Sequence, residues 1–231
     1  MKPILFNTEM VKAIIDGRKT VTRRLVKNAP NNVYAGRCVL GAGLFDEATN
    51  MRVVEPTFKI GDILYVRETW QKVRVMKPQR AVPADFSEIH YYYRADGEIA
   101  NSDDTPFLWR PSIHMPKEAA RIFLKVKSVR VERLQSITED QALAEGVPDD
   151  WPMDPVYCPV CKGDGLVGAV HPATLGYMEV DCPHCEKAVS RFANLWNSTI
   201  KPADLLTCGW EANPWCWVIE FERFEKPNKE E

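Results

Sequence analysis

The segment Asp16-Gly17-Arg18-Lys19-Thr20-Val21-Thr22-Arg23-Arg24 joins a predicted helix to a predicted strand. The helix should begin at Thr8, whose hydroxyl can accept a hydrogen bond from the first turn, and end at Gly17, which tolerates left-handed backbone. Apolar residues recur at helical spacing between these two ends. Beyond Thr20, β-branched residues alternate with polar ones, a pattern typical of a strand. The segment therefore places four cations and two threonine hydroxyls at a helix-to-strand corner.

Other segments show strand alternation or helical periodicity. Apolar residues interleaved with charges predict a strand at residues 121–134, and a phase shift near Ser128 predicts a β-bulge. Residues 138–141 fit a capping box, which predicts a short helix reaching Gly146. Further strands are predicted at residues 3–7, 63–66, 89–94 and 215–221, a weak hairpin within 27–52, and an amphipathic helix at 188–197. Short strands are mixed with a few short helices, and strands and helices do not alternate as in repeated βαβ units. This pattern indicates the α+β class with a small β-barrel.

The bulk composition excludes some function classes. The 231 residues carry a formal net charge of −2, so the chain as a whole offers no field that attracts nucleic acid, and any polyanion would need a local basic patch. No apolar run is long enough for a transmembrane helix, and the N-terminus turns polar too soon for a secretion signal. We therefore expect a cytoplasmic protein that does not enter a membrane.

Two C-x-x-C pairs carry the strongest chemical signal. Cys158 and Cys161 form one pair, Cys182 and Cys185 the other, with 20 residues between them. A two-residue spacer lets both thiolates of a pair face one ion, and two pairs complete a tetrahedron. We predict a structural Zn²⁺ held by these four cysteines. The alternative is four unrelated reduced thiols.

Aromatic and cationic residues also gather near two other predicted strand ends. The run Arg67-Glu68-Thr69-Trp70 follows a buried strand, and Trp109-Arg110-Pro111 opens a loop that contains His114. Aromatic faces and guanidinium groups are suited to stacking on a flat base. The alternatives are that Trp70 and Trp109 close a core and that His114 is a packed or capping residue.

These residues resemble the ASCH family, a branch of the PUA-like superfamily, and most closely its prophage-associated members. The resemblance covers about residues 2–150 and 188–224. It is carried by Pro3-Ile4-Leu5-Phe6, Gly17-Arg18-Lys19-Thr20-x-Thr22-Arg23, Gly61-Asp62-x-Leu64-x-Val66-Arg67-Glu68-Thr69-Trp70, Pro111-Ser112-Ile113-His114-Met115-Pro116, Ile137-Thr138-Glu139-x-x-Ala142-x-x-Glu145-Gly146 and Asn213-Pro214-Trp215-x-Trp217-Val218.

The resemblance implies a fold and a domain plan. We expect a PUA-like small β-barrel with flanking short helices over residues 1–224, a zinc-knuckle insertion at 151–187 and a disordered tail at 225–231. The superfamily is associated with RNA and modified bases, so the expected partner is RNA or a modified nucleoside. Arg18, Arg23, Arg67, Glu68, Trp70, Trp109 and His114 are the expected binding residues.

One branch that the chain resembles hydrolyses the acetyl amide of N4-acetylcytidine. By this resemblance Lys19, Thr22 and Glu145 would be the catalytic residues. A base would have to take the Thr22 proton, and a lysine whose pKa is depressed could do so. The alternatives are a non-catalytic RNA-binding protein and a phage-associated interaction protein that docks a partner. In those cases Thr22 lines a strand, Lys19 binds phosphate and Glu145 caps a helix or forms a salt bridge.

The zinc prediction can be tested by elemental analysis of the purified chain. Wild-type protein should contain about one zinc per chain, because four thiolates bind Zn²⁺ tightly at neutral pH. Cys158→Ser should lose zinc, whereas Cys38→Ser, at a position without ligand spacing, should retain it. A zinc content below about half an equivalent in the wild type would count against the site.

Overall fold

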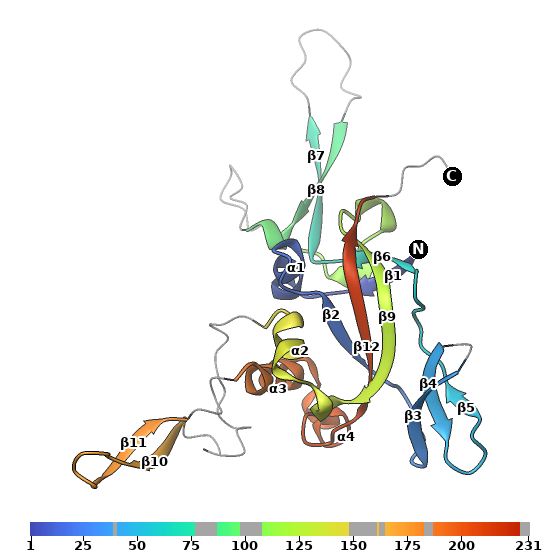
Figure 1. The fold of residues 1–231 in the computed structure, drawn as a ribbon. Helices are drawn as coiled ribbons and strands as arrows, with labels where there is room; N and C mark the ends of the chain where they lie inside the picture. Colours follow the sequence, from blue (N-terminus) through green and yellow to red (C-terminus); the bar gives the residue numbers. More distant parts are fainter. Residues whose placement is uncertain are drawn as a thin grey trace. The chain divides into compact units, whose positions relative to one another are not determined.

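The computed structural model describes residues 1–38, 41–76, 87–97, 108–147, 161, 165–182 and 187–226. The chain forms two compact units, each assembled from segments far apart in the sequence (Figure 1). The first unit comprises Met1–Gly17, Gly61–Val126 and Phe221–Glu231. The second comprises Arg18–Ile60 and Lys127–Glu220. Each unit is described by itself.

The first unit has a three-strand arrangement and one regular helix. Strand β1 (Lys2–Leu5) pairs in parallel with β6 (Ile63–Arg67), and β6 pairs antiparallel with the start of β9 (Phe123–Arg133). Helix α1 spans Thr8–Ile15, and its N-cap is Asn7 and not the predicted Thr8. The Asn7 side chain accepts a hydrogen bond of 2.8 Å from the Met10 amide.

A hairpin and three short 3₁₀ helices complete the first unit. Strands β7 (Trp70–Met76) and β8 (Ser87–Tyr93) form the long hairpin visible in Figure 1. The 3₁₀ helices are η1 (Arg94–Asp96), η2 (Ser112–His114) and η3 (Lys117–Ala119). Trp70, Met115 and Phe123 pack together in the core of this unit.

The second unit contains a sheet in the order β9-β12-β2 and a smaller three-stranded sheet. Strand β12 (Trp215–Phe224) pairs antiparallel with β2 (Val21–Leu25). The smaller sheet contains β3 (Val33–Cys38), β4 (Gly41–Asp46) and β5 (Arg52–Val54), where a weak hairpin was expected. Gly43 permits the close approach of β5, since a Cβ there would lie 2.9 Å from the Val54 carbonyl oxygen.

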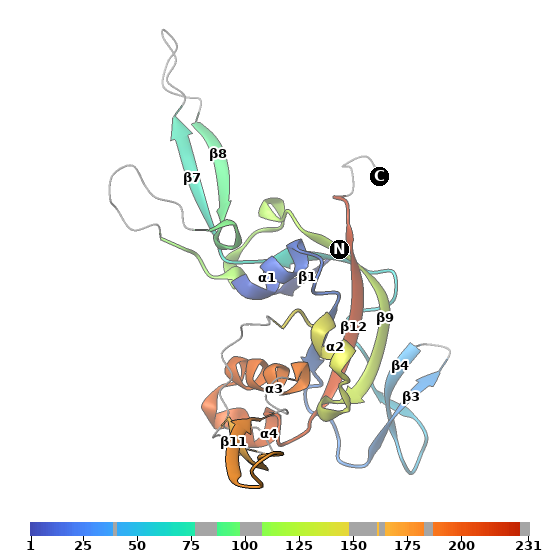
Figure 2. The ribbon, with the colours of Figure 1, turned by 60° about the vertical axis from the view of Figure 1, so that its left-hand side comes forward.

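Short helices cover one face of β2 in the second unit. Helix α2 (Glu139–Ala144) has the predicted capping box between Thr138 and Gln141. It lies beside α3 (Ala188–Thr199) in both ribbon views (Figures 1 and 2). The remaining elements are η4 (Leu134–Ser136), η6 (Pro202–Asp204), α4 (Leu205–Cys208) and a hairpin of β10 (Leu166–Val170) and β11 (Tyr177–Asp181).

The predicted α+β class is confirmed, because several sheets are combined with few, short helices. The described strands form no closed barrel: the largest sheet runs β1-β6-β9-β12-β2 with different strands at its two edges. Closure would require its two edge strands to pair. None of the helices in the described ranges combines the length and hydropathy needed to cross a bilayer. The tail predicted to be disordered lies, beyond residue 226, outside the described residues.

Candidate functional site

Among the described residues of the second unit, Lys19 is the most deeply buried cation. Its side chain is inaccessible to solvent, just before strand β2. The ammonium donates to three oxygens: the Val21 carbonyl at 2.8 Å, the Glu145 carbonyl at 2.8 Å and the Glu145 carboxylate at 2.6 Å. Three donors matched by three acceptors explain how a charged amine can be retained without water.

Glu145 reaches Lys19 because of the way helix α2 ends. It is the C-cap of the helix, and Gly146 follows in the left-handed region with φ 77°. Lys19 and Glu145 form an isolated antiparallel bridge, and the Thr20 amide donates to the Ala144 carbonyl at 2.9 Å. Backbone pairing therefore places the two residues side by side.

Arg23 supplies the second cation for the same carboxylate. Its Nη1 atom lies 3.2 Å from Glu145 Oε1, and its Nη2 atom donates to Gln141 Oε1 at 2.6 Å. The guanidinium also lies 5.8 Å from the centre of the Phe192 ring and 3.6 Å from Glu132 Oε2. Arg23 thereby connects β2 with both α2 and α3.

The pKa of the Lys19 ammonium is lowered from its ordinary value. The main cause is burial, which disfavours the charged form, and the like charges of Arg24 and Arg23 act in the same direction. The carboxylate of Glu145 opposes the shift through its charge and its hydrogen bond. A lysine with a lowered pKa loses its proton more readily, which is what a general base requires.

Thr22 is buried in the middle of β2, where it pairs with Ile219. Because side chains alternate along a strand, Thr22 and Arg24 share one face and Arg23 occupies the other. The contacts of Arg23 with Gln141 and Phe192 identify its face as the one covered by helices. The structure therefore brings Lys19 and Glu145 together, whereas Thr22 lies on the face of β2 opposite that of Arg23.

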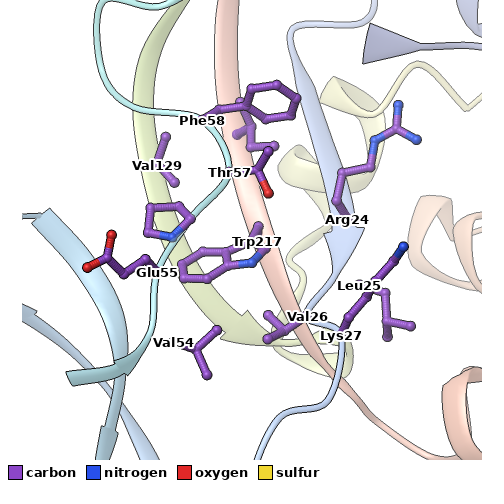
Figure 3. Close-up of a pocket in the computed structure, with 12 residues that line it drawn as sticks. Arg24, Leu25, Val26, Lys27, Val54, Glu55, Thr57, Phe58, Val129 and Trp217 are labelled. Carbon is purple, nitrogen blue, oxygen red and sulfur yellow. The ribbon is translucent and has the colours of Figure 1, made fainter. Parts of the chain in front are cut away.

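A pocket opens on the Thr22 and Arg24 side of this sheet (Figure 3). Its volume is about 340 Å³, and all of its lining belongs to the second unit. Trp217, directly paired with Arg24, stands at its centre, and Phe58 and Val129 stand at its edges. The polar lining consists of Arg24, Lys27, Glu55 and Thr57. An aromatic floor with a few polar groups at the rim is typical of a small-molecule site.

Cys216 is excluded as a nucleophile beside this network. It pairs with Leu25 on the helix-covered face and is completely buried. Burial raises the pKa of its thiol to about 12, so the reactive thiolate does not form near neutral pH. Its role is that of a small buried residue, as its lack of ligand spacing indicated.

The remaining predicted binding residues are divided between the units. Arg18, in the second unit, is exposed and donates to the Gly146 carbonyl at 3.4 Å. The others lie in the first unit: Arg67, Glu68, Trp70, Trp109 and His114. The cleft expected to unite Lys19 with Arg67 and Trp70 thus joins residues of different units and stays a prediction.

Within the first unit, internal contacts occupy several of these residues. Arg67 donates to the Met115 carbonyl at 2.8 Å and to the Ile113 carbonyl. Trp70 is only 3% exposed, with Arg110 5.5 Å from its ring centre, so little of the ring is open to a base. His114 is exposed and Trp109 half-buried.

Glu68 forms a two-point ion pair with Arg121 at 3.0 Å for both contacts. The carboxylate is 1% exposed, and Arg121 lies 3.9 Å from the centre of the Tyr93 ring. Burial raises the pKa of Glu68, although Arg121 counteracts the shift. Pairing of this kind suits a structural carboxylate better than one that meets a ligand.

The cysteine region is described only in part, and the zinc site stays a prediction. Cys161 and Cys182, one from each pair, are buried in a single cluster with Val167. Cys158 and Cys185 lie outside the described residues, and within the described ones no group of three or more ligands is present.

Several residues of this site were not identified from the sequence. Gln141 was assigned only to a capping box, whereas it also binds Arg23. Trp217 and Phe58 meet in the pocket although their strand and loop are far apart in the chain. The alternation of side chains around Trp215 and Trp217 indicated that both tryptophans lie on one face of a strand. Periodicity alone does not tell which other segment packs against that face.

The ion network should dominate the stability of the second unit. Glu145→Ala leaves two buried cations without their carboxylate and should reduce the free energy of unfolding by about 3–5 kcal/mol in urea titrations. Glu145→Gln, which retains hydrogen-bond acceptors, should cost less. Asp140→Ala, an exposed carboxylate on the same helix, should change it by about 0.5 kcal/mol at most. Equal effects of Glu145→Ala and Asp140→Ala would contradict the assigned role.

Comparisons with family models, with curated proteins and with solved structures found no match to this chain.

Proposed function

We propose that this protein binds the base of a modified nucleoside or of RNA, as an ASCH-type protein with a PUA-like architecture would. The observation that carries the proposal is the pocket of about 340 Å³ beside β2. Its volume falls at the lower end of the range of ligand sites, as suits one flat heterocycle.

The pocket residues supply the contacts that such a ligand needs. Phe58 is half-buried and offers apolar surface to the face of a ring, and Trp217, although only 7% exposed, contributes to the same lining. Bases are commonly held by aromatic stacking. Lys27, which is exposed, can donate to ring acceptors or to a phosphate. Thr57 and Glu55 can pair with the polar edge, and Glu55 is held by Arg52 at 2.5 Å. A neutral base needs no basic field, which agrees with a net charge of −2.

The zinc site has a supporting role in this proposal. A closed shell of four thiolates leaves no position for a substrate. The ion would therefore hold the fold of residues 151–187 together and would not contact the ligand. Such thiolates persist in a reducing cytoplasm, the compartment expected for this chain.

Base recognition can be tested by calorimetric titration with cytidine, N4-acetylcytidine and adenosine. Wild-type protein should bind at least one of them, and Phe58→Ala should weaken binding about 5-fold to 100-fold through the loss of stacking. The matched control is Phe224→Ala, which removes a partly exposed ring of the first unit. Absence of binding at millimolar nucleoside, or equal affinities of both variants, would refute the proposal.

A second candidate function is hydrolysis of the acyl amide of an N4-acylated cytidine. The observation in its favour is the contact of 2.6 Å between Lys19 and Glu145, together with the lowered pKa of Lys19. In this reaction the Thr22 oxygen bonds to the acyl carbonyl carbon while its proton passes to neutral Lys19. The carbon–nitrogen bond then breaks, and the leaving amine takes that proton.

The resulting acyl-threonine ester is cleaved by water, which releases a carboxylic acid and restores the hydroxyl. Glu145 stabilises the ammonium that forms on Lys19 during the first step. The competing interpretation, base binding without catalysis, is favoured by the three acceptors around Lys19, because they stabilise the protonated amine.

Turnover of N4-acetylcytidine, followed by chromatography, distinguishes these functions. Thr22→Val removes the hydroxyl but keeps the β-branched shape, and should lower the rate at least about 100-fold. Thr22→Ser keeps a hydroxyl and should retain measurable activity, whereas Lys19→Ala should be inactive. Full activity of Thr22→Val or of Lys19→Ala would exclude this mechanism, and binding without turnover would leave the non-catalytic function.

A further inference from the structure

A second hollow adjoins the base pocket at the end of strand β2. Its volume is about 570 Å³, and it shares Leu25, Val26 and Lys27 with the first. Trp215 lines the second hollow, as Trp217 lines the first. We call the two hollows together the β2 groove, all of whose lining belongs to the second unit.

Strand geometry sets the spacing of the two indoles. Trp215 and Trp217 are two residues apart on β12 and therefore lie on the same face, about 6.7 Å apart along the strand. Consecutive bases of a duplex strand are separated by only about 3.4 Å along the helix axis. Bases that contacted both indoles would therefore be separated from one another, as they are in single strands that proteins bind.

The second hollow has the chemistry of a nucleotide site. Its charged residues are Lys27 and Arg133, both exposed, and no carboxylate is present among its described lining residues. Arg133 lies over Trp215, 4.2 Å from the ring centre, and its guanidinium plane offers a further stacking surface. Asn28, Asn31 and Thr207 add exposed amides and a hydroxyl that can pair with base edges.

Lys27 holds a special position because both hollows include it. A cation between two base sites would lie where the phosphate joining two nucleotides must pass. Local cations of this kind can attract a polyanion even though the chain as a whole is slightly acidic.

We infer that the β2 groove binds two consecutive nucleotides of a single-stranded nucleic acid, one at Trp217 and one at Trp215, with Lys27 at the phosphate between them. This inference rests on the proposed base-binding function and narrows its ligand to an oligonucleotide. The two hollows alone do not separate RNA from DNA, since the shared chemistry is that of bases and phosphate.

Fluorescence anisotropy with labelled single-stranded six-nucleotide RNA and DNA tests the inference. At least one strand should bind about tenfold or more tightly than a mononucleotide, which is measured by competition. Lys27→Ala and Arg133→Ala should each weaken oligonucleotide binding roughly tenfold. Each should also make the slope of the logarithm of the binding constant against the logarithm of the salt concentration shallower by about 0.7 for each phosphate that is no longer neutralised. Lys117→Ala, an exposed cation of the first unit, is the charge-matched control.

The mononucleotide arm separates this inference from the function on which it rests. Arg133→Ala should weaken oligonucleotide binding more than nucleoside binding, because Arg133 does not line the first hollow. Phe58→Ala should weaken the binding of both ligands. If the oligonucleotide binds less than about threefold more tightly than a mononucleotide, the two-site groove is overturned while base binding stands. The same holds if Arg133→Ala leaves oligonucleotide binding unchanged. Preference for duplex over single strands also overturns it, and failure of both nucleoside and oligonucleotide to bind overturns both proposals.

Discussion

The buried ion network of Lys19, Glu145 and Arg23 is the interaction on which the second unit depends. Moving three charges out of water costs several kcal/mol for each ion, and only close pairing with well-placed acceptors offsets that cost. Here the carboxylate lies 2.6 Å from the amine and 3.2 Å from the guanidinium. Because Glu145 ends helix α2, the network ties that helix to the beginning of β2.

Strand β2 serves different purposes on its two faces. Arg23 faces the helices, where its contacts hold α2 and α3 against the sheet. Arg24 and Lys27 are among the residues that line the pocket together with Trp217. Alternation of side chains along a strand permits this division, since adjacent residues point in opposite directions. One face of β2 thus carries the ion-paired network, and the other face lines the pocket.

The arginines of the two units illustrate how context decides the role of a cation. In the first unit Arg67 donates to backbone carbonyls, and Arg121 is paired with Glu68 and Asp96. In the second unit Lys27 and Arg133 are exposed on the lining of the β2 groove. An exposed cation such as Lys27 can neutralise a ligand's phosphate without the cost of breaking a buried ion pair.

The sequence by itself determined the local features: the α+β class, the capping box at Thr138 and the concentration of charge around Lys19. Those features depend on neighbouring residues, through side-chain periodicity and hydrogen bonds to the nearest amides. Tertiary structure alone decided that Glu145 lies beside Lys19 and that Glu68 is ion-paired with Arg121. It also decided that Phe58 and Trp217 line the same pocket. These pairs are 126, 53 and more than a hundred residues apart, and no local pattern specifies contacts over such separations.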